Sequence, residues 1–559
     1  MTMNKDEVAK QVDEAGGGWV PPPLGLDARD FTATLKAVLG APLRHPQTFV
    51  KHQAAFAGEV IKALTGASEL KPAKGDKRFS DPAWTQHPAY RVLMQTYLGW
   101  TNYWHDVLDD LDIHGIDRER ARFVISLLVD AVSPSNSHIN PLAVKRMLET
   151  GGASVVHGIE NLLSDMVHNG GMPSMVDKSA FKVGENIANT EGAVVFRNEV
   201  LELIQYKPLA KKVRQRPFFM VPPMVNKYYV MDVSAEKSMV RYLLQQGQQV
   251  FIISWRNPTA EQSDWGFDTY INAAREALDV ALAISKSKDC NLWAGCAGGI
   301  VSSIMLSMMA TEKKRLVNSL SLNVCILYLP TDSQMGMMIT GTTMKKSRER
   351  TEKHGVLDGK SMANMFAWLR PNDLVWNYWV NNYLMGEKPP AFDLLYWNCD
   401  NTRLAGRFHR ELMQLIANKW LAHPGEMKVG GVPIDLKQVD CDVFALGGDT
   451  DHITPWRDCY ESTHFLGGKC DFILSNSGHI QAMLNPPGNK KSSYFTNPAR
   501  PADADKWLEG ATQQSGTWWE WWIKWLNERG GDLVDAPTAL GNKTHLALYP
   551  APGKYVLEP

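Results

Sequence analysis

The chain has 559 residues, of which 44% are hydrophobic and 21% charged, and its formal net charge is −1. This balance is typical of a folded protein with a large core and argues against general affinity for nucleic acid. The seven cysteines are odd in number and widely spread, which favours a reducing, cytoplasmic compartment and predicts no metal site. No apolar run reaches the roughly 18 residues of a membrane-spanning helix, so we expect no transmembrane segment and no signal peptide.

The first part of the chain has a mainly helical pattern, and we predict a helical N-terminal domain over residues 1–190. Glycine and proline clusters at 16–18, 21–23 and 170–173 interrupt this pattern. The aromatic residues around Trp84 are interpreted as helical core. No catalytic constellation is found in this region.

From about residue 193 short apolar strands alternate with helical segments. Strands at spacings that admit crossover helices form a mostly parallel sheet, so we predict an α/β domain over residues 191–559. The expected strands are 193–196 and 200–204 as a hairpin, then 218–221 and 250–254, and the expected helices are about 235–245 and 270–284.

Cys296 lies in the run Asn-Leu-Trp-Ala-Gly-Cys-Ala-Gly-Gly-Ile, residues 291–300, in which small residues crowd the thiol. Ala294 precedes it by two positions and Gly298 follows by two, which is the spacing of the nucleophile elbow of α/β-hydrolases with cysteine in place of serine. Small neighbours allow a strand and a helix to approach at a strained turn. Residues 300–310 predict a helix whose N-terminus points at the sulfur and favours the thiolate. The alternative is a buried structural cysteine beside glycines that serve packing.

On this fold an acid and then a histidine follow the nucleophile, each after a later strand. The strand candidate 442–446 runs into a turn-rich loop that carries Asp449 and Asp451. The strand candidate 471–474 is followed by Ser-Asn-Ser-Gly and then His479. The chain therefore has the parts of a Cys-His-Asp triad in the order that the fold requires.

Some assignments have rivals within the same loops. His452 adjoins the acid and is the rival base, but we interpret it as a structural histidine because neighbours in sequence rarely share a catalytic hydrogen bond. Both Asp449 and Asp451 are candidates for the acid on the residues alone.

The loop after strand 218–221 is where this fold supplies an oxyanion-hole amide. Because the prolines at 222 and 223 have no N–H, the possible donors are Met224, Val225 and Asn226, together with Ala297 after the nucleophile. The alternative is a plain turn.

A further strand is expected at 324–329, and the stretch between it and the acid strand, about 330–438, is too long for a loop. We predict a cap inserted into the α/β-hydrolase fold. Its aromatic residues at 365–383 suit a lid over an apolar acyl pocket, and core packing explains them equally well. The basic run 345–350 is interpreted as a solvated helix face.

Several long motifs, in order, resemble those of polyhydroxyalkanoate synthases, and the resemblance spans nearly the whole chain. The sequences of residues 81–84 and 170–174 look most like those of class II members of this family. This resemblance implies a single-subunit type of enzyme that favours medium-chain substrates. The family's box has glycine where Ala294 stands, and because alanine is also small we expect the turn to be kept. The motifs are the cysteine run and residues 221–229, 254–258, 368–379, 451–456 and 477–481.

The resemblance implies polymerisation of (3R)-hydroxyacyl-CoA into polyhydroxyalkanoate with release of CoA. His479, oriented by Asp451, would deprotonate Cys296, whose thiolate attacks the acyl thioester. The amides of Val225 and Ala297 would hold the oxyanion, and the terminal hydroxyl of the growing chain would then be activated for elongation. The chemistry needs no metal or redox cofactor.

The same motif match selects Asp451 as the acid and leaves Asp449 as a turn carboxylate. We expect Cys325, Ser477 and Gln481 to lie near the sulfur, and we interpret them as substrate-binding residues that control acyl-chain length.

The family resemblance also implies a cytoplasmic homodimer at polyhydroxyalkanoate granules, with granule-associated proteins as partners and the N-terminal domain in dimer or granule association. Two other functions stay open, a cysteine-dependent acyl hydrolase such as a thioesterase or lactone hydrolase and a non-catalytic granule coat protein. The coat protein draws support from the tryptophan-rich run 518–526, which could sit on an apolar polymer. We interpret that run as the last helix of the hydrolase domain.

Overall fold

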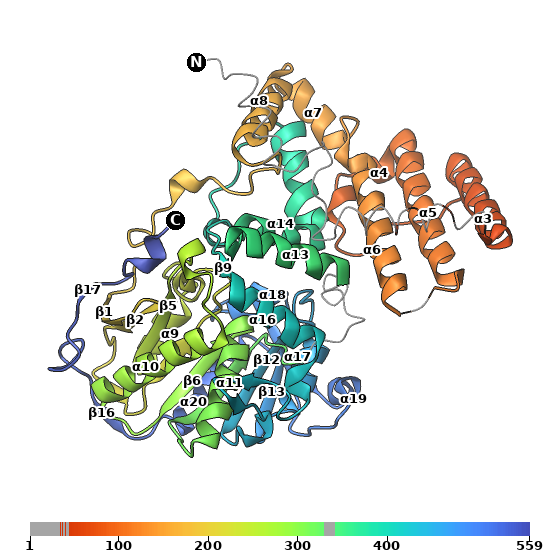
Figure 1. Cartoon of the computed structure of the whole chain (residues 1–559). Coiled ribbons are helices and arrows are strands. Elements are labelled where there is room, and N and C mark those ends of the chain that lie inside the picture. The colour runs from red at the N-terminus through yellow and green to blue at the C-terminus, as the bar shows by residue number, and fades with distance from the viewer. Residues whose placement is uncertain (1–33, 35, 37–39, 41–43, 114, 329–340) are drawn as a thin grey trace. The chain divides into compact units, whose positions relative to one another are not determined.

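The computed structural model describes residues 34, 36, 40, 44–113, 115–328 and 341–559 (Figure 1). The chain forms two compact units, each described by itself. Unit 1 comprises Met1–Asp177 with Asn364–Phe392, and unit 2 comprises Lys178–Ala363 with Asp393–Pro559. The aromatic part of the expected cap thus belongs to unit 1, while the domain boundaries at 190 and at 330–438 stay predictions.

Unit 1 is built from helices packed around an aromatic core. Trp84 is fully buried, and its ring meets Phe79 edge-on with 5.1 Å between centroids. The interpretation of this region as helical core is therefore confirmed. The helices are α3 (Pro46–Thr65), α4 (Ala83–Gln86), α5 (Pro88–Asp110), α6 (Gly115–Ala131), α7 (Pro141–Glu149) and α8 (Ala153–His168).

The inserted part of unit 1 packs closely on α8. It continues α14 (Gly359–Leu369) with two π-helical turns, η6 (Asn372–Trp376) and η7 (Trp379–Leu384). A Cβ at Gly158 would lie 2.0 Å from the Tyr383 carbonyl oxygen, so only glycine allows this approach. The Tyr383 hydroxyl donates to Asp165 at 2.8 Å. These contacts are core packing, and a role of this stretch as a lid stays a prediction.

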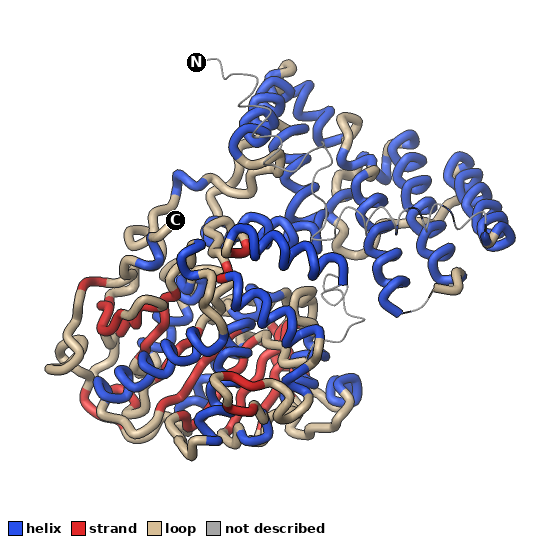
Figure 2. The backbone as a smooth tube through the Cα atoms, viewed as in Figure 1, coloured by secondary structure: helices blue, strands red, loops and turns tan. Residues whose placement is uncertain are grey.

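Unit 2 contains an eleven-stranded sheet with helices around it, and Figure 2 shows its strands in red between blue helices. The strand order is β15-β14-β13-β12-β7-β6-β4-β5-β2-β1-β17, and the six strands from β13 to β5 are parallel. The predicted, mostly parallel sheet is confirmed. The strands are β1 (Gly192–Arg197), β2 (Leu201–Tyr206), β4 (Phe218–Val221), β5 (Val250–Trp255), β6 (Cys290–Gly295), β7 (Val317–Asn323), β12 (Asp442–Gly448), β13 (Cys470–Ser475), β14 (Ser493–Thr496), β15 (Thr512–Ser515) and β17 (Tyr549–Pro550).

Three strand pairs lie outside this sheet, β3 (Lys212–Arg214) with β16 (Leu533–Asp535), β8 (Val356–Leu357) with β9 (Leu404–Ala405), and β10 (Lys428–Val429) with β11 (Val432–Pro433). None of the helices in the described ranges is long and apolar enough to cross a membrane. The helices of unit 2 are α9 (Met239–Gln245), α10 (Phe267–Ser285), α11 (Cys296–Thr311), α13 (Gly341–His354), α15 (Asp393–Asn398), α16 (Gly406–Ala417), α17 (Trp456–Thr463), α18 (His479–Met483), α19 (Ala504–Glu509) and α20 (Trp518–Glu528).

The prediction of a strand at residues 324–329 is wrong. The strand that pairs beside β6 is β7, and the chain turns at Val324, whose φ is +44°. Residues 324–327 are buried because this loop packs inside the unit, where Val324 N–H donates to the Leu446 carbonyl and Leu327 N–H to the Ser462 hydroxyl, each at 2.8 Å. Leu329 and Pro330 lie outside the described residues.

Helix α20 forms the centre of the core on one face of the sheet. Its Trp518, Trp519 and Trp522 are fully buried, and Trp522 Nε1 donates to Ser321 Oγ of β7 at 3.0 Å. Trp518 Nε1 donates to the Ala482 carbonyl of α18 at 2.7 Å. The interpretation of the tryptophan run as a core helix is confirmed, and its buried face is not available to a polymer surface.

We expect Trp522→Ala to destabilise unit 2 by about 3–5 kcal/mol, because the substitution leaves a large cavity and an unpaired Ser321 hydroxyl. Scanning calorimetry should show a melting temperature lowered by several degrees. Trp521→Ala on the same helix is the matched control, since Trp521 is only half-buried, and it should cost less. Equal losses in the two variants would contradict the assigned packing.

Candidate active site

Cys296 occupies a strained turn between β6 and α11. Its φ is +46°, in the left-handed region that residues with a Cβ rarely adopt, and α11 begins at this residue. The preceding Ala294 is completely buried, so its methyl group fits where the family has glycine. The thiol itself is half-buried. The sequence predicts a turn of this kind, and the alanine does not disturb it.

Two glycines allow α11 to approach its neighbours behind this turn. A Cβ at Gly298 would lie 2.4 Å from the carbonyl oxygen of Val221, at the end of β4. A Cβ at Gly299 would lie 2.6 Å from the Sγ of Cys325. Both distances are far below van der Waals contact. At Gly298 the obstacle is backbone, so that position requires glycine, whereas at Gly299 the obstacle is a side chain that would have to shift. The N-terminus of α11 therefore lies directly against the loop that follows β4.

The Asp451 carboxylate follows β12 and is fully enclosed. Its Oδ1 accepts the backbone N–H groups of Ile453 at 2.9 Å and Thr454 at 3.0 Å. Its Oδ2 accepts the Thr454 hydroxyl at 2.7 Å and lies 2.7 Å from His479 Nδ1. Such a network holds a buried carboxylate ionised and in one orientation.

His479 is the first residue of α18, and its imidazole lies between Asp451 and Cys296. Burial disfavours the charged ring, but the charge and hydrogen bond of Asp451 outweigh burial and raise the pKa of His479, as does its hydrogen bond with Cys296. Burial likewise opposes ionisation of Asp451, and the imidazole and the Thr454 hydrogen bonds still lower the pKa of its carboxyl. Because Nδ1 faces Asp451, Nε2 is the ring nitrogen left for the thiol. The structure thus brings all three predicted triad residues together.

Asp449 and Ser477 hold the histidine loop in shape. Asp449 Oδ1 accepts the Ser477 N–H at 2.7 Å, and Ser477 has a φ of +137°. The carboxylate therefore anchors a strained turn two residues before His479, whereas Asp451 is the carboxylate that contacts the imidazole. His452 is half-buried on the acid loop, and its interpretation as a structural histidine stays a prediction.

Thr454 is a site residue that sequence reasoning missed. Its hydroxyl donates to Asp451 and lies 3.0 Å from His479 Nδ1, so it contacts both members of the pair. A threonine three residues after an acidic loop residue is a common local hydrogen-bonding pattern, and this spacing was the available signal.

Among the expected pocket residues, Cys325 lies deepest and Gln481 is exposed. Burial, and then the nearby Cys296, raise the pKa of the Cys325 thiol well above its usual value. Cys459 of α17 was not predicted, and it is buried with its Sγ 3.5 Å from the Thr454 carbonyl oxygen. Two buried thiols thus lie near the site, Cys325 near Cys296 and Cys459 near Asp451. Ser477, the remaining expected pocket residue, is half-buried on the loop before His479.

The expected oxyanion donors lie on the two elements that meet at Gly298. Ala297 is in the first turn of α11, where N–H groups have no partner within the helix. Val225 is half-buried in the turn of the loop after β4. Their roles as donors stay predictions.

A strained residue between a parallel strand and a helix, with an acid and a histidine after later strands, places the catalytic unit in the α/β-hydrolase fold class. Residues 226–486 match the family model described as "alpha/beta hydrolase fold". Residues 75–243 match "Poly-beta-hydroxybutyrate polymerase (PhaC) N-terminus".

The chain is similar over its whole length to poly(3-hydroxyalkanoate) polymerases. It is 48% identical to poly(3-hydroxyalkanoate) polymerase 1 of Ectopseudomonas oleovorans, over 99% of both chains. It is 45% identical to polymerase 2 of that organism, over 96% of both chains, and 40% identical to polymerase subunit PhaC of Cupriavidus necator, over 88% of this chain and 84% of that one. The chain belongs to the poly(3-hydroxyalkanoate) polymerase family of acyltransferases, and the class II resemblance agrees with these relatives.

We expect the stability difference between the wild type and Asp451→Asn to depend on pH. The raised pKa of His479 makes its contribution complete below its ordinary value of 6.5 and lost as the pH rises toward about 10. The lowered pKa of Asp451 makes its contribution complete above 3.8 and lost as the pH falls through the lowered value. Melting temperatures should differ most between about pH 4 and 6.5 and converge toward pH 10. A difference that stays constant across this range would contradict the ion pair.

Thr454→Val should lower kcat for acyl transfer by about ten- to a hundredfold, because a hydrogen bond to a charged group contributes about 1.5–3 kcal/mol and about 1.4 kcal/mol corresponds to tenfold. Thr454→Ser keeps the hydroxyl and should stay within about threefold of the wild type. Steady-state kinetics of both variants, with melting curves to check folding, measure the effect. If valine and serine gave the same rate, the hydroxyl would have no part in orienting the pair.

Proposed function

We propose that this chain polymerises (3R)-hydroxyacyl units from their CoA thioesters into polyhydroxyalkanoate through a covalent acyl-Cys296 intermediate. The observation that carries the proposal is the imidazole of His479, hydrogen-bonded to Asp451 at 2.7 Å and interacting with Cys296, in a chain of the polymerase family. Polymerisation of hydroxyacyl units follows from the family to which the chain belongs. Cys296, His479 and Asp451 supply the chemistry that we propose for this reaction.

Acylation starts from the imidazolium of His479 and the thiolate of Cys296, because the raised pKa of His479 favours the charged ring that holds the thiol's proton. The thiolate attacks the acyl carbonyl carbon, and the amides of Val225 and Ala297 stabilise the oxyanion that forms. The bond between the carbonyl carbon and the CoA sulfur then breaks, and the imidazolium returns its proton to the leaving thiolate. Because one thioester replaces another, the step is nearly balanced in free energy.

Elongation uses the hydroxyl at the end of the growing chain. His479 accepts the proton of this hydroxyl as its oxygen attacks the carbonyl carbon of an acyl thioester. An ester bond forms, the carbon–sulfur bond breaks, and the thiolate released takes up that proton. Asp451 stabilises the charged imidazole during both steps. Exclusion of water from the site prevents hydrolysis of the thioester intermediate, so that it persists until this hydroxyl attacks.

We further propose that the enzyme favours medium-chain acyl groups and that Cys325 limits chain length. The support is the resemblance of residues 81–84 and 170–174 to class II members of the family, together with the position of Cys325, which is completely buried and near the Cys296 thiol. Ser477 lies on the histidine loop and is a second candidate, while the exposed side chain of Gln481 makes it the weakest of the three. Because the product is an apolar polyester, we propose that the enzyme works at cytoplasmic granules of that polymer. We also propose that it is a homodimer and that granule-associated proteins are its partners.

We test the function with a graded series of (3R)-hydroxyacyl-CoA thioesters, measuring free CoA and polymer together. The wild type should release CoA in step with polymer and prefer medium-chain substrates. Cys296→Ala should lose more than about a thousandfold in CoA release with an unchanged melting temperature, because no other group replaces the nucleophile.

Three outcomes would contradict this function. Release of free hydroxy acid without polymer would make the protein a hydrolase. Appreciable polymer from Cys296→Ala would remove the covalent intermediate. A preference for the shortest acyl groups would remove the medium-chain assignment.

A further inference from the structure

The loop 222–228, which carries Val225, is held by buried side chains from other parts of unit 2. Three of its carbonyl oxygens accept hydrogen bonds from such side chains, so the loop's backbone is fixed at intervals along its length. The donors are Trp255 Nε1 to Pro222 O at 2.8 Å, Thr402 Oγ1 to Met224 O at 2.9 Å, and Trp397 Nε1 to Lys227 O at 2.7 Å.

Lys227 anchors the far end of this loop with its own side chain. The ammonium group is buried and meets three oxygens, Val556 O at 2.7 Å, Glu558 O at 3.1 Å and Asp400 Oδ1 at 3.0 Å. An ammonium group has three N–H donors, so this set of acceptors satisfies it completely. Tyr229 holds the other oxygen of Asp400 at 2.7 Å. The side chain therefore ties the loop to a segment far along the chain.

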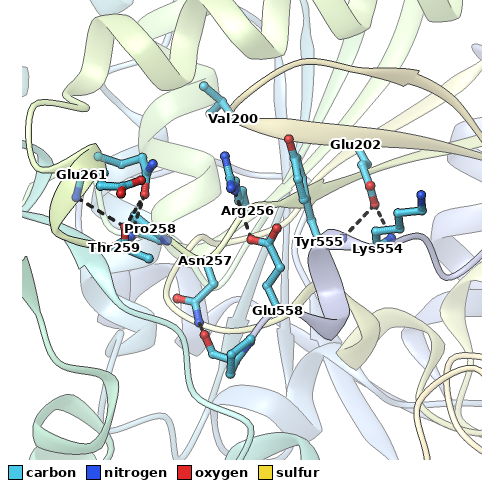
Figure 3. Close-up of polar contacts among 12 residues, drawn as sticks. Val200, Glu202, Arg256, Asn257, Pro258, Thr259, Glu261, Lys554, Tyr555 and Glu558 are labelled. Carbon is cyan, nitrogen blue, oxygen red and sulfur yellow. Dashed lines mark hydrogen bonds and ion pairs between the residues drawn. The ribbon is translucent and has the colours of Figure 1, made fainter.

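The segment that receives Lys227 is itself fixed to the sheet. Glu202 of β2 is completely buried and accepts the backbone N–H groups of Lys554 at 2.8 Å and Tyr555 at 3.1 Å (Figure 3). The Tyr549 hydroxyl donates to the same carboxylate at 2.6 Å. A buried carboxylate with several donors is a rigid attachment, because any movement leaves its charge unpaired.

Arginine side chains fix the same segment from β1 and from the residue after β5. The guanidinium of Arg197 lies 4.5 Å and that of Arg256 5.2 Å from the centre of the Tyr555 ring. Arg256 Nε also pairs with the Glu558 carboxylate at 3.1 Å, as Figure 3 shows. Residues 553–558 thus form a strut from the sheet to Lys227.

We propose that Lys227 is a positioning residue for acyl transfer, which holds the loop against this strut so that the Val225 N–H stays at the oxyanion position. The inference rests on the proposed function and deepens it. It assigns to a buried cation, with no contact to the reacting atoms, the task of keeping an oxyanion donor in place. Removal of one such donor costs about a hundredfold to a thousandfold in kcat, so its displacement should cost somewhat less.

Lys227→Met keeps the length of the side chain and removes its charge and donors. We expect kcat for CoA release to fall by about ten- to a hundredfold with KM changed by less than about threefold, since the donor acts mainly in the transition state. The rate at which iodoacetamide alkylates Cys296 should stay near that of the wild type, because the thiol and its base are intact. Lys227→Arg keeps the charge and donors and should recover much of the loss.

The matched control is Lys207→Met. Lys207 follows β2 and pairs with Glu191 at 2.7 Å at the opposite edge of the sheet from the loop, and its loss should leave kcat within about twofold. Asp400→Asn is a milder second variant, in case Lys227→Met does not fold. It removes the charge that pairs with Lys227 and should lower kcat by about three- to tenfold with Cys296 alkylation unchanged.

The outcomes separate this inference from the function on which it rests. A wild type that releases no CoA from hydroxyacyl thioesters overturns the proposed function and the inference with it. Normal wild-type turnover with an unchanged kcat in Lys227→Met, or in Asp400→Asn where that variant is used, overturns the positioning role alone. Alkylation of Cys296 that falls in parallel with kcat also overturns it, because the whole site, and not the loop, has then changed.

Discussion

The approach of helix α11 to the end of β4 is the constraint on which the catalytic unit depends. At Gly298 no side chain fits, because a Cβ would lie 2.4 Å from the Val221 carbonyl oxygen. A helix this close leaves no room for a relaxed connection from β6, and Cys296 takes the left-handed conformation as a result. The same approach sets the first amides of the helix beside the loop that carries Val225. One contact between backbones therefore shapes both the thiol and its surroundings.

Parallel pairing explains how residues far apart in the sequence meet at this turn. Strands β6, β12 and β13 run in the same direction, so the residues that follow them emerge at one edge of the sheet. Burial then gives the charges their strength, because Asp451 and His479 interact where little water screens them. The carboxylates of Asp451 and Asp449 at this edge both have partners, the Thr454 hydroxyl for Asp451 and the Ser477 N–H for Asp449.

The elements that could be predicted are those that local sterics determine. The small residues around Cys296 and the turn before His479 are readable from spacing, and so are the apolar strands that precede Asp451 and His479. Strand β7 was missed because Ser319 and Ser321 interrupt its apolar pattern, and only the folded sheet reveals their partners, Asn291 and Trp522. The apolar run 324–329 predicts a strand instead, whereas residues 324–327 are buried as a loop. The contact of Thr454 with His479 and the contacts of Lys227 join segments that are distant in the sequence, and no local pattern encodes them.

The strut at residues 553–558 also has a consequence for biosynthesis. Cys296, Asp451 and His479 are synthesised before these residues. Glu202 is synthesised earlier still, so it has no partner in the backbone N–H groups of Lys554 and Tyr555 until late in translation. A nascent chain that has folded its thiol, imidazole and carboxylate into place still lacks two of the three acceptors of Lys227, the carbonyl oxygens of Val556 and Glu558. Under the positioning role, such a chain would meet acyl-CoA with a poorly ordered loop and become acylated slowly. Full activity would therefore require residues 553–558 to have been made and to have bound Glu202.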